Sequence, residues 1–190
     1  MDNKERSALL VMDMIPAILQ RLDGQALKDL LQNVKTAISA ARSAGIPIIY
    51  IALGFRKGFP DVSPQSKAFA QLRTAGNPAF EGPVLIHPDL NRQPEDLIVV
   101  KKRFSAFTGS DLELVLRSGD IRHLVLTGIS TSGVVLSTLR EAADKDFHLS
   151  VLSDACTDAD PEVHRVLITK IFPRQADVQT AAEWAAAING

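Results

Sequence analysis

The chain has 190 residues, 46% of them hydrophobic, and a formal net charge of −1. This length and composition suit one globular domain over residues 1–190, and the balanced charge gives no electrostatic basis for binding nucleic acid or an anionic membrane surface. A single cysteine excludes an internal disulfide, and residues 1–6 lack the apolar run of a signal peptide, so we expect a cytoplasmic protein.

The first half of the chain predicts two buried strands connected by a helix and followed by a long loop. Residues 8–12 and 47–52 are continuous apolar runs, as in strands that are covered on both faces. Between them, residues 24–44 carry apolar side chains at helical spacing. Residues 54–96 then contain six of the ten prolines, with one short helix expected at 66–73. An irregular segment of this length in a compact domain usually has a functional role.

The second half continues the alternation of strands and helices. Apolar runs predict the strands, and the stretches that follow them have the spacing and end signals of helices. The expected strands span residues 97–101, 123–127, 148–152 and 176–178, and the expected helices span residues 111–118, 132–145, 160–171 and 180–188. This alternation predicts an α/β fold, a Rossmann-like doubly wound sheet of about six mainly parallel strands with helices on both faces.

Three polar positions follow predicted strands, at the edge where open parallel sheets bind ligands. Asp13 follows the first strand, Lys101 ends the third, and residues 130–133 follow the fourth. We expect these side chains to form a site. The alternatives are that Asp13 only caps a following turn, and that Lys101, in a run of three basic residues, only faces solvent.

The turn after the fourth predicted strand has the features of a hydrolytic site. Residues 124–126 are apolar, a Thr-Gly pair follows, and small polar residues open a helix near Ser132. Unpaired backbone N–H groups and the helix dipole at such a position favour an oxyanion. No cysteine lies in this turn.

Three blocks of the sequence resemble the isochorismatase-like hydrolase superfamily. They are residues 8–14 (ALLVMDM), 100–107 (VKKRFSAF) and 127–131 (TGIST), and they occur in the family's order. The middle block is the most specific of the three, and the likeness covers nearly the whole chain. The resemblance implies a parallel sheet of six strands and a catalytic triad of Asp, Lys and Cys.

The resemblance also assigns roles to particular residues. Asp13 matches the family's acid or base, and Lys101 matches its lysine. A non-proline cis peptide is implied near Ile129 and Ser130, where it shapes an oxyanion hole together with Thr131. Such bonds persist mainly where function needs them.

The third member of the triad is absent from this chain. The resemblance places the family's cysteine at Val134, and Gly133 reaches that position only through a local shift of register. Neither residue carries a nucleophile. Cys156 follows the fifth predicted strand, and we expect an inert, half-buried thiol there, with a functional role as the alternative.

We therefore hypothesise a small-molecule hydrolase that uses Asp13 and Lys101 without a cysteine nucleophile. The resemblance includes isochorismatases that also lack the cysteine, in which an Asp protonates a vinyl-ether carbon and water captures the oxocarbenium ion. Burial raises the pKa of a carboxyl toward this role, and a nearby lysine lowers it. This chain departs from those enzymes at Ile15, where they usually carry Gln, and at Val134, where they carry Gly.

Two alternatives remain open at this stage. One is a serine nucleophile among residues 130–132 with Asp13 as its base, against which stands the simpler role of these hydroxyls as helix caps. The other is a catalytically silent member of the family that binds a small ligand or acts as an assembly partner.

The remaining predictions concern the substrate, cofactors and partners. Arg56 follows the second predicted strand and is placed to bind an anionic group, unless it is only solvated, with Phe55 as part of an apolar wall. Phe104 is a further expected substrate-binding residue. The histidines show no ligand spacing and no Gly-x-Gly-x-x-Gly follows the first strand, so we expect neither a metal nor a cofactor. The resemblance implies a homo-oligomer, and the Ala-rich segment around Trp184 is the expected contact surface.

Overall fold

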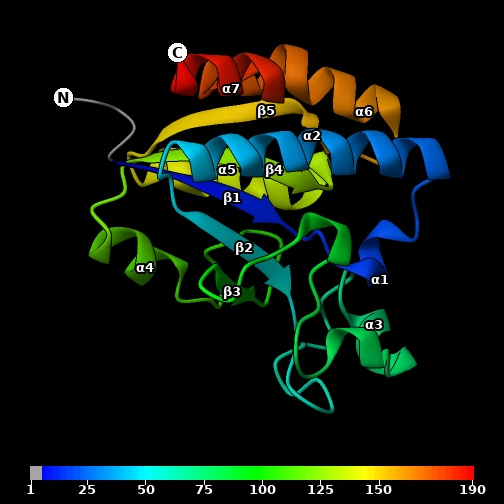
Figure 1. Cartoon of the computed structure of the whole chain (residues 1–190). Coiled ribbons are helices and arrows are strands. Elements are labelled where there is room, and N and C mark those ends of the chain that lie inside the picture. Colours follow the sequence, from blue (N-terminus) through cyan, green and yellow to red (C-terminus); the bar gives the residue numbers. More distant parts are fainter. Residues whose placement is uncertain (1–5) are drawn as a thin grey trace.

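Figure 1 shows a computed structural model of the chain, in which residues 6–190 are described. Residues 1–5 lie outside the described residues, and with them most of the segment 1–6 on which the signal-peptide prediction was made. Among residues 6–190, no helix combines the length and the apolar character that crossing a membrane requires.

Six strands form one parallel sheet in the order β3-β2-β1-β4-β5-β6, as the alternating pattern predicts. The strands are β1 (Ser7–Met12), β2 (Ile48–Leu53), β3 (Leu97–Lys101), β4 (His123–Ile129), β5 (His148–Thr157) and β6 (Asp177–Gln179). The strand order reverses between β1 and β4, where Met12 lies opposite Gly128. A reversal of this kind opens a crevice at the carboxyl ends of the two strands.

Two strands are longer than the sequence predicts. β4 continues to Ile129 and β5 to Thr157, because a shift of register after Leu126 lets the two strands pair again beyond the irregularity. Cys156 therefore lies within β5, opposite Gly128, and not after the strand as expected.

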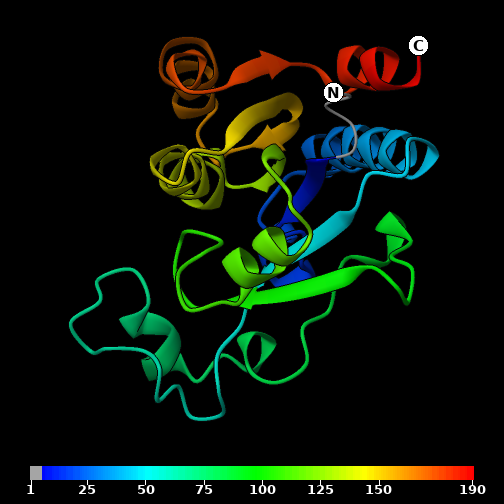
Figure 2. The same ribbon diagram turned by 90° about the vertical axis from the view of Figure 1, so that its left-hand side faces the viewer.

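Helices cover both faces of the sheet (Figure 2). They are α1 (Pro16–Leu19), α2 (Gly24–Ser43), α3 (Ala70–Ala75), α4 (Leu112–Ser118), α5 (Leu136–Asp144), α6 (Pro161–Val166) and α7 (Ala181–Asn189). Two predicted helices are divided: the first begins as a π-helical turn, Thr131–Val135, that leads into α5, and the second ends as one, Leu167–Ile171, after α6. The predicted helix at 66–73 is α3, which ends at Gly76 in the left-handed conformation.

The core consists of two layers, one on each face of the sheet. Alternate residues of β1 enter opposite layers, Leu10 on the side of α4 and α5 and Leu9 on the side of α2 and α7. This two-sided burial explains why β1 is a continuous apolar run. Trp184 of α7 is 3% exposed and packs in the second layer, so any contact surface on this Ala-rich segment consists of the residues around Trp184.

The long segment between β2 and β3 packs a third, smaller cluster of its own. Phe55, Phe59, Phe69 and Phe80 are buried there against Leu53 at the end of β2. The segment forms the lower lobe in Figure 1, with α3 on its outer side. The aromatic cluster therefore fixes a loop with little regular structure next to the carboxyl ends of the strands.

Candidate active site

Asp13 and Lys101 form a buried ion pair at the carboxyl end of the sheet. Lys101 Nζ lies 2.8 Å from Asp13 Oδ2, and the two side chains are 2% and 7% exposed, respectively. The strand ends bring them together, since Asp13 directly follows β1 and Lys101 is the last residue of β3. The structure thus places both predicted residues in one site and excludes the solvent-facing alternative for Lys101.

Each partner of the pair is held by a backbone group. The Leu53 N–H at the end of β2 donates to Asp13 Oδ1 at 2.9 Å, and Lys101 Nζ donates to the Arg103 carbonyl at 3.0 Å. Burial raises the pKa of Asp13 above its ordinary value, and the Lys101 ammonium and the Leu53 hydrogen bond offset this only in part. A carboxyl in such an environment is suited to hold a proton and donate it.

The backbone after β4 has two unusual features next to this pair. Gly128 has a φ of +131°, and a Cβ atom there would lie 2.1 Å from the Met12 carbonyl oxygen, so no other residue fits. The peptide bond between Ile129 and Ser130 is cis, at the position that the resemblance implies.

The hydroxyl groups after the cis bond do not cap the helix. Ser130 is at the N-cap position, but its side chain makes no capping hydrogen bond, and Thr131 Oγ1 is hydrogen-bonded to His164 Nδ1 at 2.8 Å. The helix start is satisfied instead by Asp158 Oδ2, which accepts a hydrogen bond from the Ser132 N–H at 2.7 Å. The capping role that sequence reasoning favoured for the hydroxyls is therefore incorrect.

A pocket of about 400 Å³ opens onto the ion pair. Asp13 and Lys101 lie in its wall together with Ile129, Ser130, Gly133 and Val134, all of which the sequence analysis singles out, whereas Thr131 does not line it. Val134 is 2% exposed and presents an alkyl group where the family's cysteine is expected. The pocket therefore contains an acid and an ammonium group without a thiol.

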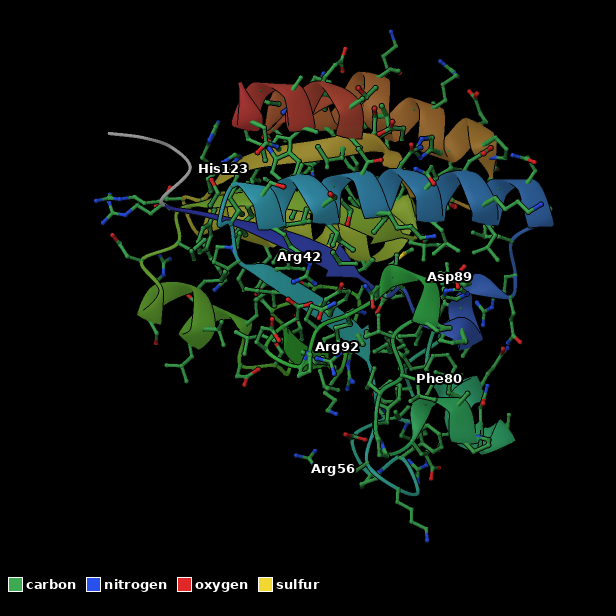
Figure 3. All side chains as sticks on the ribbon, in the orientation of Figure 1. Arg42, Arg56, Phe80, Asp89, Arg92 and His123 are labelled. Atoms are coloured by element: carbon green, nitrogen blue, oxygen red, sulfur yellow. The ribbon has the colours of Figure 1, made fainter. Side chains whose placement is uncertain are left out.

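One of the three predicted substrate-binding residues lines this pocket. Phe104 is part of the wall and lies against Phe69, with ring centroids 4.9 Å apart. Phe55 is buried in the aromatic cluster of the loop, away from the pocket wall. Arg56 extends away from the protein in Figure 3 and pairs with Asp61 at 3.3 Å. The structure therefore places Phe55 and Arg56 outside the wall of this pocket.

Several lining residues were not singled out by sequence reasoning, and four of them carry charged or aromatic side chains. They are Arg21, which follows α1, Phe69 and Phe80 of the long loop, and Asp158, which follows β5. The proline-rich loop was expected to be functional, but no local pattern distinguishes these two phenylalanines. Asp158 follows a strand, as the other site residues do, and this position was a usable signal.

The single thiol is remote from this chemistry. Cys156 is 4% exposed, its Sγ faces the Leu126 carbonyl oxygen at 3.8 Å, and burial raises its pKa to about 12. It does not line the pocket. Within residues 6–190, His, Cys, Asp and Glu side chains form no group of three or more that could hold a metal ion.

The sheet order, the cis peptide and the buried Asp–Lys pair together define an isochorismatase-like fold and site. Residues 7–183 match the family model described as the isochorismatase domain. The chain therefore belongs to the isochorismatase family of hydrolases.

Individual relatives agree with this assignment. The chain is 35% identical over 179 residues to the ureidoacrylate amidohydrolase RutB of Enterobacter sp. (strain 638), covering 83% of this chain and 78% of that protein. It is similar to an isochorismatase family protein from Burkholderia thailandensis, with a TM-score of 0.80, 29% identity, and 100% and 98% of the two chains covered. A cysteine hydrolase from Pseudomonas syringae pv. phaseolicola shares the fold, with a TM-score of 0.85, 23% identity, and 100% and 94% covered.

Proposed function

We propose that this protein hydrolyses a small molecule by acid catalysis from Asp13, with Lys101 as its partner and without a cysteine nucleophile. The observation that carries the proposal is the buried Asp13–Lys101 pair, which lies in a pocket wall where Val134 stands in place of a thiol. The substrate is an ether or a compound with a hydrolysable C–N bond. The ureidoacrylate amidohydrolase relative supports the second of these classes.

The chemistry follows from the raised pKa of Asp13. The protonated carboxyl donates its proton to a vinyl-ether carbon or to a leaving nitrogen, and water adds to the electrophilic carbon that results. In the C–N case the added water returns one proton to the carboxylate, and the C–N bond breaks with its nitrogen already protonated. In the vinyl-ether case the added water returns its first proton to the carboxylate, and its second proton passes to the ether oxygen as the C–O bond breaks. Lys101 stabilises the carboxylate that forms when the proton leaves, because its ammonium lies 2.8 Å from Oδ2.

The test is an assay of isochorismate, ureidoacrylate and a panel of amides and vinyl ethers. Asp13→Asn keeps the size of the side chain but cannot supply the proton, so we expect kcat/KM to fall by roughly 10²–10⁴-fold. Asp89→Asn is the matched control, because Asp89 is exposed in the short 3-10 helix Pro88–Leu90 (Figure 3). Turnover that survives Asp13→Asn would refute the mechanism.

A second function has one observation in its favour. Val134 fills the position of the nucleophile with a side chain that takes no part in covalent chemistry. The alternative is a catalytically silent member of the family that binds a small ligand or an assembly partner. Ligand binding without turnover of any compound in the panel would support it.

A further inference from the structure

Ser130 carries a hydroxyl group in the pocket that the mechanism above does not use. The residue lines the same pocket as Asp13 and Lys101. Among residues 6–190, no hydrogen-bond partner of its Oγ is present, and it does not cap the helix that follows. A hydroxyl in a pocket wall without a protein partner is available to a ligand.

The neighbouring hydroxyls are engaged or lie elsewhere. Thr131 is fully buried and bonded to His164, whereas Ser132 is exposed and lies outside the pocket wall. Asp158 accepts the hydrogen bond of the Ser132 N–H, so this N–H does not need the Ser130 hydroxyl as its acceptor. Of the three consecutive hydroxyls, only that of Ser130 is both unpartnered and in the pocket wall.

Gly133 leaves the space in which the Ser130 hydroxyl lies. A Cβ atom on Gly133 would be 2.6 Å from Ser130 Oγ, closer than such atoms approach, but 3.8 Å from the Phe104 ring and 3.9 Å from Ser130 Cβ. Gly133 has no positive φ, so the hydroxyl is the one neighbour that alanine would displace. The absence of a side chain at 133 therefore leaves room for the hydroxyl in its present position.

The character of the pocket indicates what this hydroxyl binds. In its ionised, ion-paired form Asp13 balances the charge of Lys101, and the two other charged lining residues, Arg21 and Asp158, have opposite signs. The remaining wall is largely apolar and includes Phe69 and Phe104. A pocket without excess charge and with aromatic walls fits a neutral compound that has a planar apolar part and an oxygen acceptor.

We propose that the Ser130 hydroxyl, kept in position by the absence of a side chain at Gly133, donates a hydrogen bond to the carbonyl oxygen of a small neutral amide. The inference rests on the proposed function, because it selects the substrates with a C–N bond from the two classes named there. The binding step is separate from turnover, so it is measured without reference to the role of Asp13.

The experiment is calorimetric titration of the full chain with benzamide and with thiobenzamide, whose sulfur is a weaker hydrogen-bond acceptor. We expect the wild type to bind benzamide more tightly. Ser130→Ala removes the donor and Gly133→Ala displaces it, so each weakens benzamide binding by about five- to tenfold, the effect of one hydrogen bond. The double variant binds as weakly as Ser130→Ala and no more weakly, because both changes remove the same contact.

The control is Ser132→Ala, which removes a hydroxyl outside the pocket wall and leaves the affinity unchanged. Ser130→Ala also removes the preference for benzamide over thiobenzamide, a readout that a general loss of packing does not produce. Wild-type affinity in Ser130→Ala, additive losses in the double variant, or no binding of benzamide by the wild type would each overturn the inference. If benzamide binding persists in Asp13→Asn and no variant hydrolyses any compound, the proposed function fails and this inference stands.

Discussion

Lys101 reaches Asp13 past an intervening strand. β3 and β1 are not neighbours, because β2 lies between them, yet Nζ and Oδ2 are 2.8 Å apart. The end of β2 takes part as well, since the Leu53 N–H donates to the other carboxyl oxygen. Three adjacent strand ends thus converge on one carboxyl group.

Removing the ammonium is expected to destabilise the protein. Lys101→Met leaves Asp13 buried without its cation, and breaking a buried pair in this way costs about 3–5 kcal/mol. The double variant Asp13→Asn/Lys101→Met leaves no buried charge and should regain a large part of this stability. Urea unfolding of the wild type and the two variants measures the difference. A double variant that is less stable than Lys101→Met contradicts the assignment.

The raised pKa of Asp13 predicts a pH dependence of stability. Because the pKa is higher in the folded state than its ordinary value of 3.8, the folded state favours the protonated form. The stabilising contribution is complete below about pH 3.8 and is lost as the pH rises through the folded pKa. The free energy of unfolding of the wild type should therefore increase relative to Asp13→Asn as the pH is lowered from 7 toward 4. An unchanged difference refutes the shift.

His123 predicts the opposite dependence at the other end of the sheet. Its ring stacks on His148 with centroids 4.4 Å apart, and its two nitrogens lie 3.0 and 2.9 Å from the hydroxyls of Ser7 and Ser150. Burial and, second, the neighbouring His148 lower the pKa of His123 to about 4, against a weaker opposing effect of Asp177.

A lowered histidine pKa stabilises the fold above the unfolded value of about 6.5, and this contribution is lost between there and about pH 4. The expected loss over this range is about 3 kcal/mol, at about 1.4 kcal/mol for each unit of the shift. His123→Gln removes the titration and should reduce the fall in melting temperature between pH 7 and pH 4.5. An equal fall in both proteins contradicts the prediction.

Val134→Cys is expected to introduce a reactive thiol into the pocket. The wild type should not react with iodoacetamide, because Cys156 is buried and its pKa is about 12. A thiol at 134 lies in the pocket wall, and intact-mass analysis should show one adduct. Val135→Cys, at a fully buried position outside that wall, is the matched control and should stay unmodified. Labelling of the wild type would show that Cys156 is accessible.

The sequence predicts the sheet and the central pair because both depend on local patterns. Buried parallel strands are continuous apolar runs, and a polar residue at the end of such a run marks the ligand-binding edge. Asp13 and Lys101 are found in this way. Their mutual contact depends on the order of the strands, which places β3, β2 and β1 side by side and which the sequence analysis did not predict.

The outer wall of the pocket was not predictable because it depends on contacts between distant segments. The Phe55 N–H donates to the Phe80 carbonyl oxygen at 2.8 Å, which ties the chain after β2 to the far part of the loop. In this arrangement Phe55 packs in the aromatic cluster, and Phe69 and Phe80 of the same cluster line the pocket. Nothing in the residues next to β2 distinguishes the two arrangements.

The pocket is thus built by two structural units, the carboxyl ends of the strands and the separately packed cluster of the long loop. The residues of the proposed reaction lie at the strand ends, where the backbone is closely packed. Any side chain at Gly128, for example, would collide with the Met12 backbone. Phe69 and Phe80 belong to a small cluster packed separately from the two main layers. Substitutions at Phe69 or Phe80 change the shape of the pocket wall and leave the Asp13–Lys101 pair unchanged. A change in which compounds the pocket accepts is therefore expected to arise in this cluster.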